Sequence, residues 1–290
     1  MKTVYYLLTA GLLMVGGVQA ATIQGNDGEW NDTGTWNVAY LPGATEVDTT
    51  ILASGDNVTV TSAATYATNN VNLNVRAGAT LDISADMTVM RNMFIGDAVS
   101  SGATVTQTAG TIDRMSSTIR LGTQSTSMST YTISGSSVLD FNGNLDIGPM
   151  GLFKVVGDNV TISAGNQSTD TMTMTDAGEL EFVLGATGAS AFTVAGDFTV
   201  DSVNSQLTVD GSGYTGGEAD ITLVNAATMT GTFAAGKYNV TGMGVEGTDW
   251  TLTQGTNGDL VLNVIPEPAT LGLIAAFGGG LLFIRRFIQI

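Results

Sequence analysis

The sequence predicts an all-β protein whose body is a parallel β-helix, also called a β-solenoid. Three observations lead to this fold class. The composition is rich in residues that suit strands and tight turns, apolar and polar residues alternate along short segments, and similar segments recur 26 residues apart. A β-sandwich is the alternative fold, because it also joins many short strands by turns.

The composition favours strands over helices. The 290 residues include 43 threonines and 38 glycines but only 4 prolines. Thr and Val carry branched Cβ atoms that fit the pleated surface of a sheet, and Gly allows the positive φ angles of tight turns. Since 43 % of the residues are hydrophobic, the chain can bury a core although only 12 % are charged. We therefore expect many short strands joined by glycine turns and no long helix in the body.

Alternation with a period of two marks the individual strands. In the segment 71–76, Val71, Leu73 and Val75 fall on one face, with polar residues between them. The segment Gly55–Val60 alternates in the same way. This pattern is typical of a strand with one buried and one exposed face.

Repeats indicate how these strands are arranged. The pairs Ile95-Gly96, Leu121-Gly122 and Ile147-Gly148 stand 26 residues apart. The segment Val105–Ile112 aligns with Tyr131–Val138 at the same offset, although their glycines differ by one position. A repeat of this length corresponds to one rung of a β-solenoid, in which several short strands stack on those of the next rung.

The repeats and their flanks divide the body. We expect repeats over residues 53–177, an N-terminal cap over 21–52 and a C-terminal capping region over 178–265. The caps follow from the solenoid itself, because an exposed terminal rung invites edge pairing with another chain. Trp30 and Trp36 suit packing in the N-terminal cap better than stacking on sugar rings.

The first 20 residues predict a signal helix for export. A positive start is followed by an apolar run from Val4 to Val18, and small or polar residues lead to Ala20 and Ala21. This pattern is typical of a secretory signal peptide cleaved between Ala20 and Ala21. It implies the Sec machinery and signal peptidase as partners.

The last 25 residues, 266–290, predict a membrane-targeted tail. Pro266, Glu267 and Pro268 precede an uncharged apolar stretch over 269–284, which Arg285 and Arg286 follow. An apolar stretch of this length approaches that of a transmembrane helix, and the arginines would hold its far end at the cytoplasmic side. The body is then expected outside the cytoplasmic membrane.

Together these terminal features resemble the PEP-CTERM sorting signal of exported proteins in Gram-negative bacteria. The resemblance implies recognition of Pro266, Glu267 and Pro268 by exosortase, an integral-membrane transpeptidase or protease, with Arg285 and Arg286 as stop-transfer charges. These residues would be acted upon rather than act. Roughly over residues 50–165 the repeats also resemble those of autotransporter passenger domains, which implies a parallel β-helix.

Charge and residue types exclude several functions. Residues 21–265 hold 25 acidic and 6 basic residues, an excess of 19 negative charges that disfavours nucleic-acid binding. The chain has no Cys and no His, which removes disulfides, thiolate nucleophiles and triads of the Ser-His-Asp type. We expect no catalytic residues, no metal ligands and no cofactor.

Three weaker candidate sites remain. The segment Asp140–Asp146 places four oxygen-bearing side chains at alternate positions but lacks the Gly and Glu of an EF-hand loop, so we interpret it as a solvated polar strand face. The carboxylate pairs Glu179/Glu181 and Asp197/Asp201 suit a charged surface better than glycoside hydrolysis. The basic cluster within or beside the repeats comprises Arg91, Arg114 and Arg120.

The functional expectation is a non-enzymatic surface or extracellular-matrix protein, sorted by an exosortase-like system and anchored in the inner membrane as an intermediate. Extracellular polysaccharide is a further expected partner, and nucleic acid is not. A carbohydrate-binding adhesin is the first alternative, and a polysaccharide-active β-helix enzyme is the second. The enzyme would need clustered Arg or Lys beside carboxylates.

Overall fold

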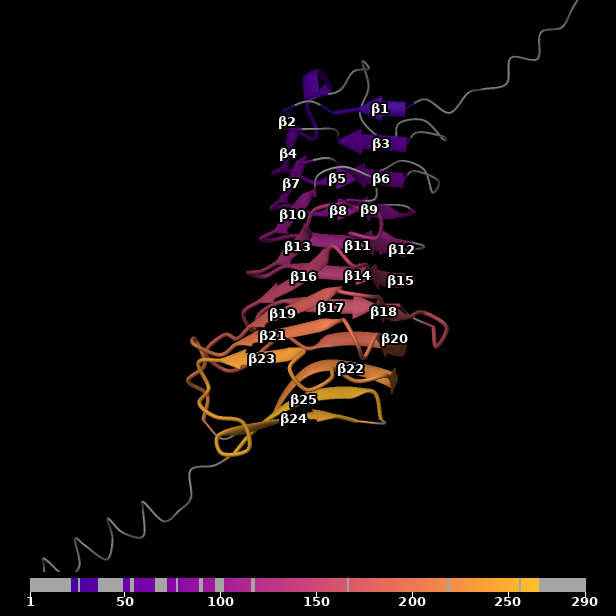
Figure 1. The fold of residues 1–290 in the computed structure, drawn as a ribbon. Helices are drawn as coiled ribbons and strands as arrows, with labels where there is room; N and C mark the ends of the chain where they lie inside the picture. The colour runs from indigo at the N-terminus through magenta and orange to yellow at the C-terminus, as the bar shows by residue number, and fades with distance from the viewer. Residues whose placement is uncertain are drawn as a thin grey trace, which may run out of the picture.

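The computed structural model describes residues 22–265, apart from 26, 36–48, 53–54, 66–71, 77, 89–90, 97–101, 116–117, 166, 218–219 and 256. Nearly all the elements in this part of the chain are strands, with one short 3-10 helix, η1 (Thr33–Thr35). The strands form a parallel β-solenoid of about six turns, the long body in Figure 1. The predicted all-β solenoid is confirmed, and the β-sandwich alternative is wrong because the body strands pair in parallel.

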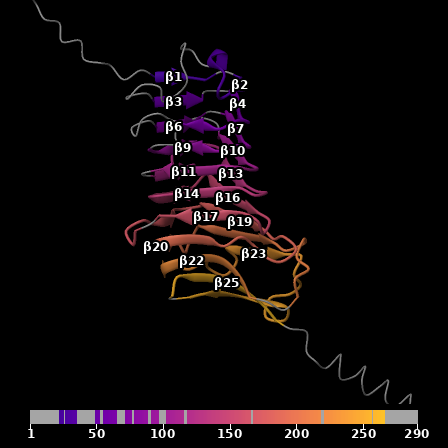
Figure 2. The same cartoon turned by 180° about the vertical axis from the view of Figure 1, so that it is seen from behind.

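Three ladders of parallel strands make up the solenoid, and Figures 1 and 2 show ladders 1 and 3 along different sides of the body. Ladder 1 contains β1 (Thr22–Gln24), β3 (Thr49–Leu52), β6 (Asn72–Val75), β9 (Met93–Ile95), β12 (Thr118–Leu121), β15 (Asn144–Ile147) and β18 (Met172–Met174). Ladder 2 contains β5 (Ala64–Thr65), β8 (Met87–Thr88), β11 (Thr111–Met115), β14 (Val138–Phe141) and β17 (Thr161–Ala164). Ladder 3 contains β2 (Gly28–Glu29), β4 (Asn57–Val60), β7 (Thr80–Ile83), β10 (Thr104–Gln107), β13 (Ser129–Ile133), β16 (Gly151–Val156), β19 (Glu179–Val183), β21 (Gln206–Asp210) and β23 (Tyr238–Thr241).

The chain visits ladders 3, 2 and 1 in turn and then begins the next rung. Strands β13, β14 and β15 form one such rung. The long strand β20 (Phe192–Val200) continues ladder 2 with its first residues, which pair with β17, and ladder 1 with its last, which pair with β18. Beyond it, β20 pairs in parallel with β22 (Ile221–Thr230).

The register confirms the 26-residue spacing where the sequence repeats are visible. Val105 pairs with Tyr131, and Leu121 pairs with Ile147. Elsewhere the step between rungs varies from 20 residues, between Leu73 and Met93, to 31 residues, between Leu207 and Tyr238. The strands therefore keep register while the corners between them absorb the differences in length.

A repeated sequence does not always occupy the same ladder. In the segment Gly55–Val60 the strand lies in ladder 3, whereas in the similar segment Gly157–Ile162 the strand that follows lies in ladder 2. Gly55 and Gly157 both adopt positive φ, at 85° and 91°, just before a strand. The similarity thus reflects the chemistry of a corner and not one position in the repeat.

Stacked columns of inward side chains fill the solenoid. In ladder 3 each inward residue lies directly over its counterpart in the next rung, and every member of the column is at most 1 % exposed. The aromatic rings of Tyr131 and Phe153 stack in this column with centroids 5.2 Å apart. The column consists of Val58, Leu81, Val105, Tyr131, Phe153, Leu180 and Leu207. Truncation of such a side chain to Ala costs about 2–5 kcal/mol, because the packed neighbours cannot collapse fully into the space.

One polar network is enclosed with this core. Gln107 and Tyr131 are both 0 % exposed, and the Tyr131 hydroxyl donates a hydrogen bond of 2.8 Å to Gln107 Oε1. Gln107 Nε2 donates to the carbonyl oxygens of Gly110 and Val138, each at 3.0 Å. The buried amide thus satisfies backbone groups where the chain turns from ladder 3 into ladder 2.

The repeated glycines lie at the corner after ladder 1. Gly96 and Gly122 adopt positive φ angles of 67° and 64°. Gly122 N donates to Ile95 O at 2.8 Å, which continues the ladder into the corner. A Cβ atom on Gly122 would collide with the backbone carbonyl of Met150 in the next rung. Close stacking of the corners and the left-handed backbone both require glycine at this position.

The N-terminal rung packs a large aromatic ring against the core. Trp30 is 1 % exposed, which confirms the interpretation that it packs and does not stack on sugar. Glu29 accepts hydrogen bonds from Thr59 Oγ1 and Thr61 N, both at 3.0 Å, and so ties β2 to the segment of β4. Burial alone would raise the pKa of Glu29, but these hydrogen bonds outweigh it and lower the pKa below the ordinary value.

At the other end a small antiparallel sheet follows the parallel rungs. Strand β25 (Asp259–Val264) pairs antiparallel with β22 and with β24 (Trp250–Gln254). Parallel pairing extends on both sides of residues 53–177, since β1 pairs with β3 before this range and β21 with β23 after it. The sequence period fades after residue 177 while the coil itself continues.

Candidate functional site

The outer face of ladder 1 gathers basic, amide and aromatic side chains on four neighbouring strands, β6, β9, β12 and β15. Outward residues on such strands alternate with buried ones, so that only every second side chain faces solvent. We name this surface the arginine face. It comprises Asn72, Asn74, Arg76, Arg91, Asn92, Phe94, Thr118, Arg120, Asn144 and Asp146.

Arg120 lies at the centre of the arginine face. Its Nε lies 3.4 Å from Asp146 Oδ2 in the next rung, and its guanidinium carbon lies 5.7 Å from the centroid of the Phe94 ring in the preceding one. The two charged side chains are 46 % and 32 % exposed, so the ion pair contributes about 0.2–1 kcal/mol at most to folding. The three residues stack because β9, β12 and β15 are adjacent and in register.

The carboxyl of Asp146 shows that this pair is not fully compensated. Partial burial raises the pKa of Asp146 above its ordinary value, and the positive charge and hydrogen bond of Arg120 offset this only in part. A single contact through Nε leaves the two Nη groups of Arg120 without a hydrogen bond to any described residue. These groups can therefore bind an anion from outside.

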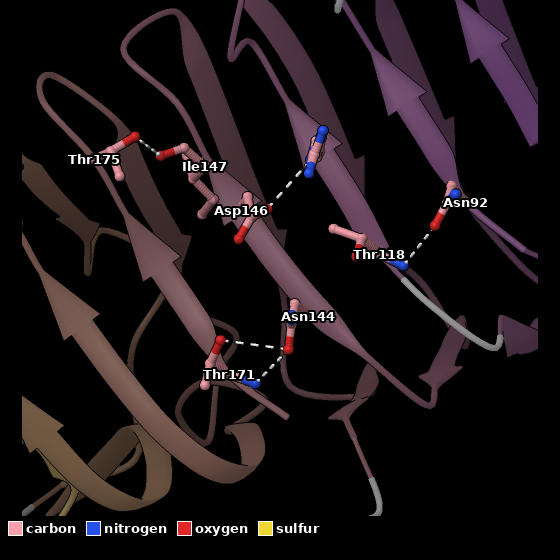
Figure 3. A network of polar contacts seen from close by, with 8 residues as sticks. Asn92, Thr118, Asn144, Asp146, Ile147, Thr171 and Thr175 are labelled. Atoms are coloured by element: carbon pink, nitrogen blue, oxygen red, sulfur yellow. Dashed lines mark hydrogen bonds and ion pairs between the residues drawn. The ribbon is translucent and has the colours of Figure 1, made fainter. Parts of the chain in front are cut away.

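Asparagine side chains fasten neighbouring rungs along one edge of the arginine face. Asn92 Nδ2 donates to Asn72 Oδ1 at 2.9 Å, and Asn92 Oδ1 accepts from Thr118 N at 3.1 Å. One rung further, Asn144 Oδ1 accepts from Thr171 N at 2.9 Å. Figure 3 shows the contacts of Asn92 with Thr118 and of Asn144 with Thr171 across neighbouring strands. The amides supply partners to backbone N–H groups at the beginnings of strands.

Arg76 and Arg91 lie at the two sides of the same rungs. Arg76 directly follows β6, and its Nη2 lies 3.5 Å from Asn74 Oδ1, while its Nε is buried without a hydrogen bond in the described part of the chain. Arg91 is exposed just before β9, and no described residue forms a hydrogen bond or ion pair with it.

The structure brings together only part of the predicted basic cluster. Arg91 and Arg120 share the arginine face, whereas Arg114 lies on β11 in ladder 2, and its side chain lies outside the described residues. Sequence reasoning missed Arg76, because β6 and β9 are offset by 20 residues and not by 26. Its position directly after the alternating segment 71–75 was the signal available.

The segment Asp140–Asp146 is not one strand face. Phe141 and Leu145 point inward as expected, but the chain turns between them, so that Asp140 lies in ladder 2 and Asp146 in ladder 1. The prediction of a single polar strand face is wrong, because the corner separates the four side chains. Among the residues described, no three acidic side chains are grouped so that they could hold a metal ion.

Both carboxylate pairs engage groups of their own rungs. On ladder 3, Glu181 Oε1 lies 2.8 Å from Lys154 Nζ, while burial and the charge of Glu181 together raise the pKa of Glu179. Asp197 accepts a hydrogen bond from Thr228 Oγ1. Asp201 Oδ1 accepts one of 3.0 Å from Val203 N in the following turn. These contacts are those of a charged, hydrogen-bonded surface.

The predicted sorting and cleavage residues lie outside the described residues. They are Ala20, Ala21, Pro266, Glu267, Pro268, Arg285 and Arg286, and Trp36 of the N-terminal region is also outside. Within the described chain there is no helix with the length and hydropathy needed to cross a membrane.

No family model, curated protein or solved structure matches the chain. The arrangement of the described residues and the chemistry of the sequence are therefore the basis of the functional argument.

Proposed function

We propose that this chain is a non-enzymatic surface or extracellular-matrix structural protein, exported through its N-terminal signal and sorted by an exosortase-like system. The observation that carries the proposal is the solenoid body, a stack of parallel rungs with a continuous core from Trp30 to Leu262 (Figure 1). Such a rod presents long, flat polar faces and holds groups at a fixed spacing. These are properties of a spacer or scaffold.

The terminal segments supply the proposed route. The signal over residues 1–20 directs export, and Pro266-Glu267-Pro268 before an apolar stretch and a basic pair resembles the PEP-CTERM signal. The expected partners are the Sec machinery, signal peptidase and an exosortase-like membrane enzyme. The proposed location is the cell surface or the medium, reached through an inner-membrane intermediate.

The mature C-terminus tests this proposal. Fractionation of the native host and mass mapping of the terminal peptides should find protein at the surface or in the medium that has lost the residues beyond Pro266–Pro268. An intact tail that ends at Ile290 in the inner membrane would refute sorting by exosortase. Protein retained in the cytoplasm would refute the surface role as well.

A carbohydrate-binding adhesin is the second candidate, and the arginine face favours it. Arg120, Phe94 and the neighbouring asparagines supply charge, an apolar ring and amide groups on one solid surface. A glycan array separates the two candidates, because an inert scaffold binds no glycan whereas an adhesin binds at least one class.

A further inference from the structure

The basic residues of this acidic chain are unevenly distributed. Side chains are described for five basic residues of the body, and three of them, Arg76, Arg91 and Arg120, lie on or beside three consecutive rungs of ladder 1. The outward residues of β6, β9, β12 and β15 include one carboxylate, that of Asp146. This face therefore has local positive charge in a body with an excess of 19 negative charges.

We propose that the arginine face binds the carboxylate groups of an anionic polysaccharide of the uronic-acid class. The inference rests on the proposed surface or matrix role, and it names the partner and the residues that hold it. Arg120 and Arg76 bind carboxylates, Phe94 packs against a sugar ring, and Asn74 with its neighbours offers amide groups to sugar hydroxyls.

Arg120 is prepared for this role by its neighbours. Phe94 lies under the guanidinium at 5.7 Å, and Asp146 contacts Nε at 3.4 Å, so both restrict the side chain. The Nη groups, which no described residue engages, form the fork that fits a carboxylate through two parallel hydrogen bonds. A restrained donor loses less conformational entropy on binding than a freely rotating one.

Arg76 supplies a second charge at a fixed distance. It follows β6, two rungs from β12, and neighbouring strands are about 4.8 Å apart, so the two arginines are separated by roughly 10 Å along the solenoid axis. An extended polysaccharide that runs along the axis repeats every second sugar over a comparable length. A chain with acidic sugars at that repeat presents one carboxylate to each arginine.

Phe94 lies between the two arginines. On β9 it pairs with Asn74 of β6 on one side and with Arg120 of β12 on the other, and it points outward from the core. A half-buried ring in that position offers an apolar surface for the carbon-bound hydrogens of a sugar.

Overall repulsion selects the class of anionic polymer. The body is acidic, so a ligand of high charge density is repelled more strongly than one of low density. Double-stranded DNA carries one charge per roughly 1.7 Å, whereas a polysaccharide carries at most one carboxylate on each sugar. At physiological ionic strength the screening length is about 8 Å, so the arginines act on a nearby carboxylate while distant acidic residues are largely screened.

The test measures binding of polygalacturonate to the full-length chain in mild detergent. The Arg76→Gln/Arg120→Gln double variant should bind about tenfold or more weakly, because two charge-assisted hydrogen-bonding groups are lost. The matched control is Lys154→Gln/Lys237→Gln, which removes the same number of charges from the strand β16 and the residue before β23 in ladder 3, and it should bind like the wild type. Dextran, a neutral glucan, serves as the uncharged probe and should not bind.

Circular dichroism melting separates a binding defect from a folding defect. If the double variant melts early, the single variant Arg120→Gln decides the question, because that side chain is largely exposed and its loss leaves the core intact. Sedimentation velocity of each variant detects self-association through the same face.

The expected result is selective loss of polygalacturonate binding in the arginine variants. Equal weakening in the lysine control, equal binding of dextran, absence of polygalacturonate binding by the wild type, or loss only of self-association would each overturn the inference. A protein found at the cell surface that does not bind polygalacturonate overturns this inference alone, whereas an intracellular location refutes the proposed function independently.

Discussion

Replacing Tyr131 with Phe isolates one buried hydrogen bond within the solenoid. The Tyr131 hydroxyl donates to Gln107 Oε1 at 2.8 Å, and both side chains are 0 % exposed. The Phe side chain keeps the stack on Phe153, whose ring centroid is 5.2 Å away, so the packing is preserved. What remains is a buried amide oxygen without a donor, a loss of about 1–3 kcal/mol in the free energy of unfolding.

The matched control is Tyr238→Phe. Its hydroxyl donates to Glu246 Oε1 at 2.6 Å, but this contact is exposed, so water replaces the lost partner. We expect a change of less than about 0.5 kcal/mol for this variant. Equilibrium unfolding in urea, followed by far-ultraviolet circular dichroism, measures both variants against the wild type.

A double-mutant cycle with Gln107→Leu sharpens the test. The Gln107→Leu change removes the acceptor of the Tyr131 hydroxyl and also the donor to the Gly110 and Val138 carbonyls, so this variant alone should be the least stable single one. Adding Tyr131→Phe to it should cost little more, because the hydroxyl has already lost its acceptor, and the coupling should be about 1 kcal/mol or more. Equal losses for Tyr131→Phe and Tyr238→Phe, or strict additivity in the cycle, would refute the reasoning.

Three further predictions concern corners, pH and the arginine face. Gly122→Ala should reduce stability by about 1–3 kcal/mol more than Gly157→Ala, because both have positive φ but only Gly122 meets the backbone of the next rung; urea unfolding measures the difference, and equal losses would show that the corner has room. Burial raises the pKa of Tyr131, so its contribution is complete below pH about 10 and is lost as the pH rises further; Tyr131→Phe should lessen the alkaline decline in stability by up to about 1.4 kcal/mol per pH unit, and parallel curves in an unfolding series above pH 10 would contradict this. Arg120→Ala should change stability by no more than about 1 kcal/mol, since the ion pair is exposed; a larger drop in melting experiments would mean that this residue supports the fold and is not reserved for a ligand.

Local signals in the sequence identified the rungs and their core. Alternation placed Leu73 and Val75 on a buried face, and the 26-residue repeat placed Leu121 over Ile147, because side-chain direction and strand register are set within a few residues. Where the corners change length, as between β6 and β9, the repeat is invisible although the strands still pair. The same limitation made the segment Asp140–Asp146 resemble a single strand.

The sequence by itself determined that this chain is a β-solenoid with glycine corners and an acidic surface, since composition and period-two alternation act locally. Only the tertiary structure decided which polar side chains share a face. Arg76, Phe94 and Arg120 come together because β6, β9 and β12 stack in register across corners of unequal length. Hydrogen bonds between parallel strands fix that register, and no fixed spacing in the sequence encodes it.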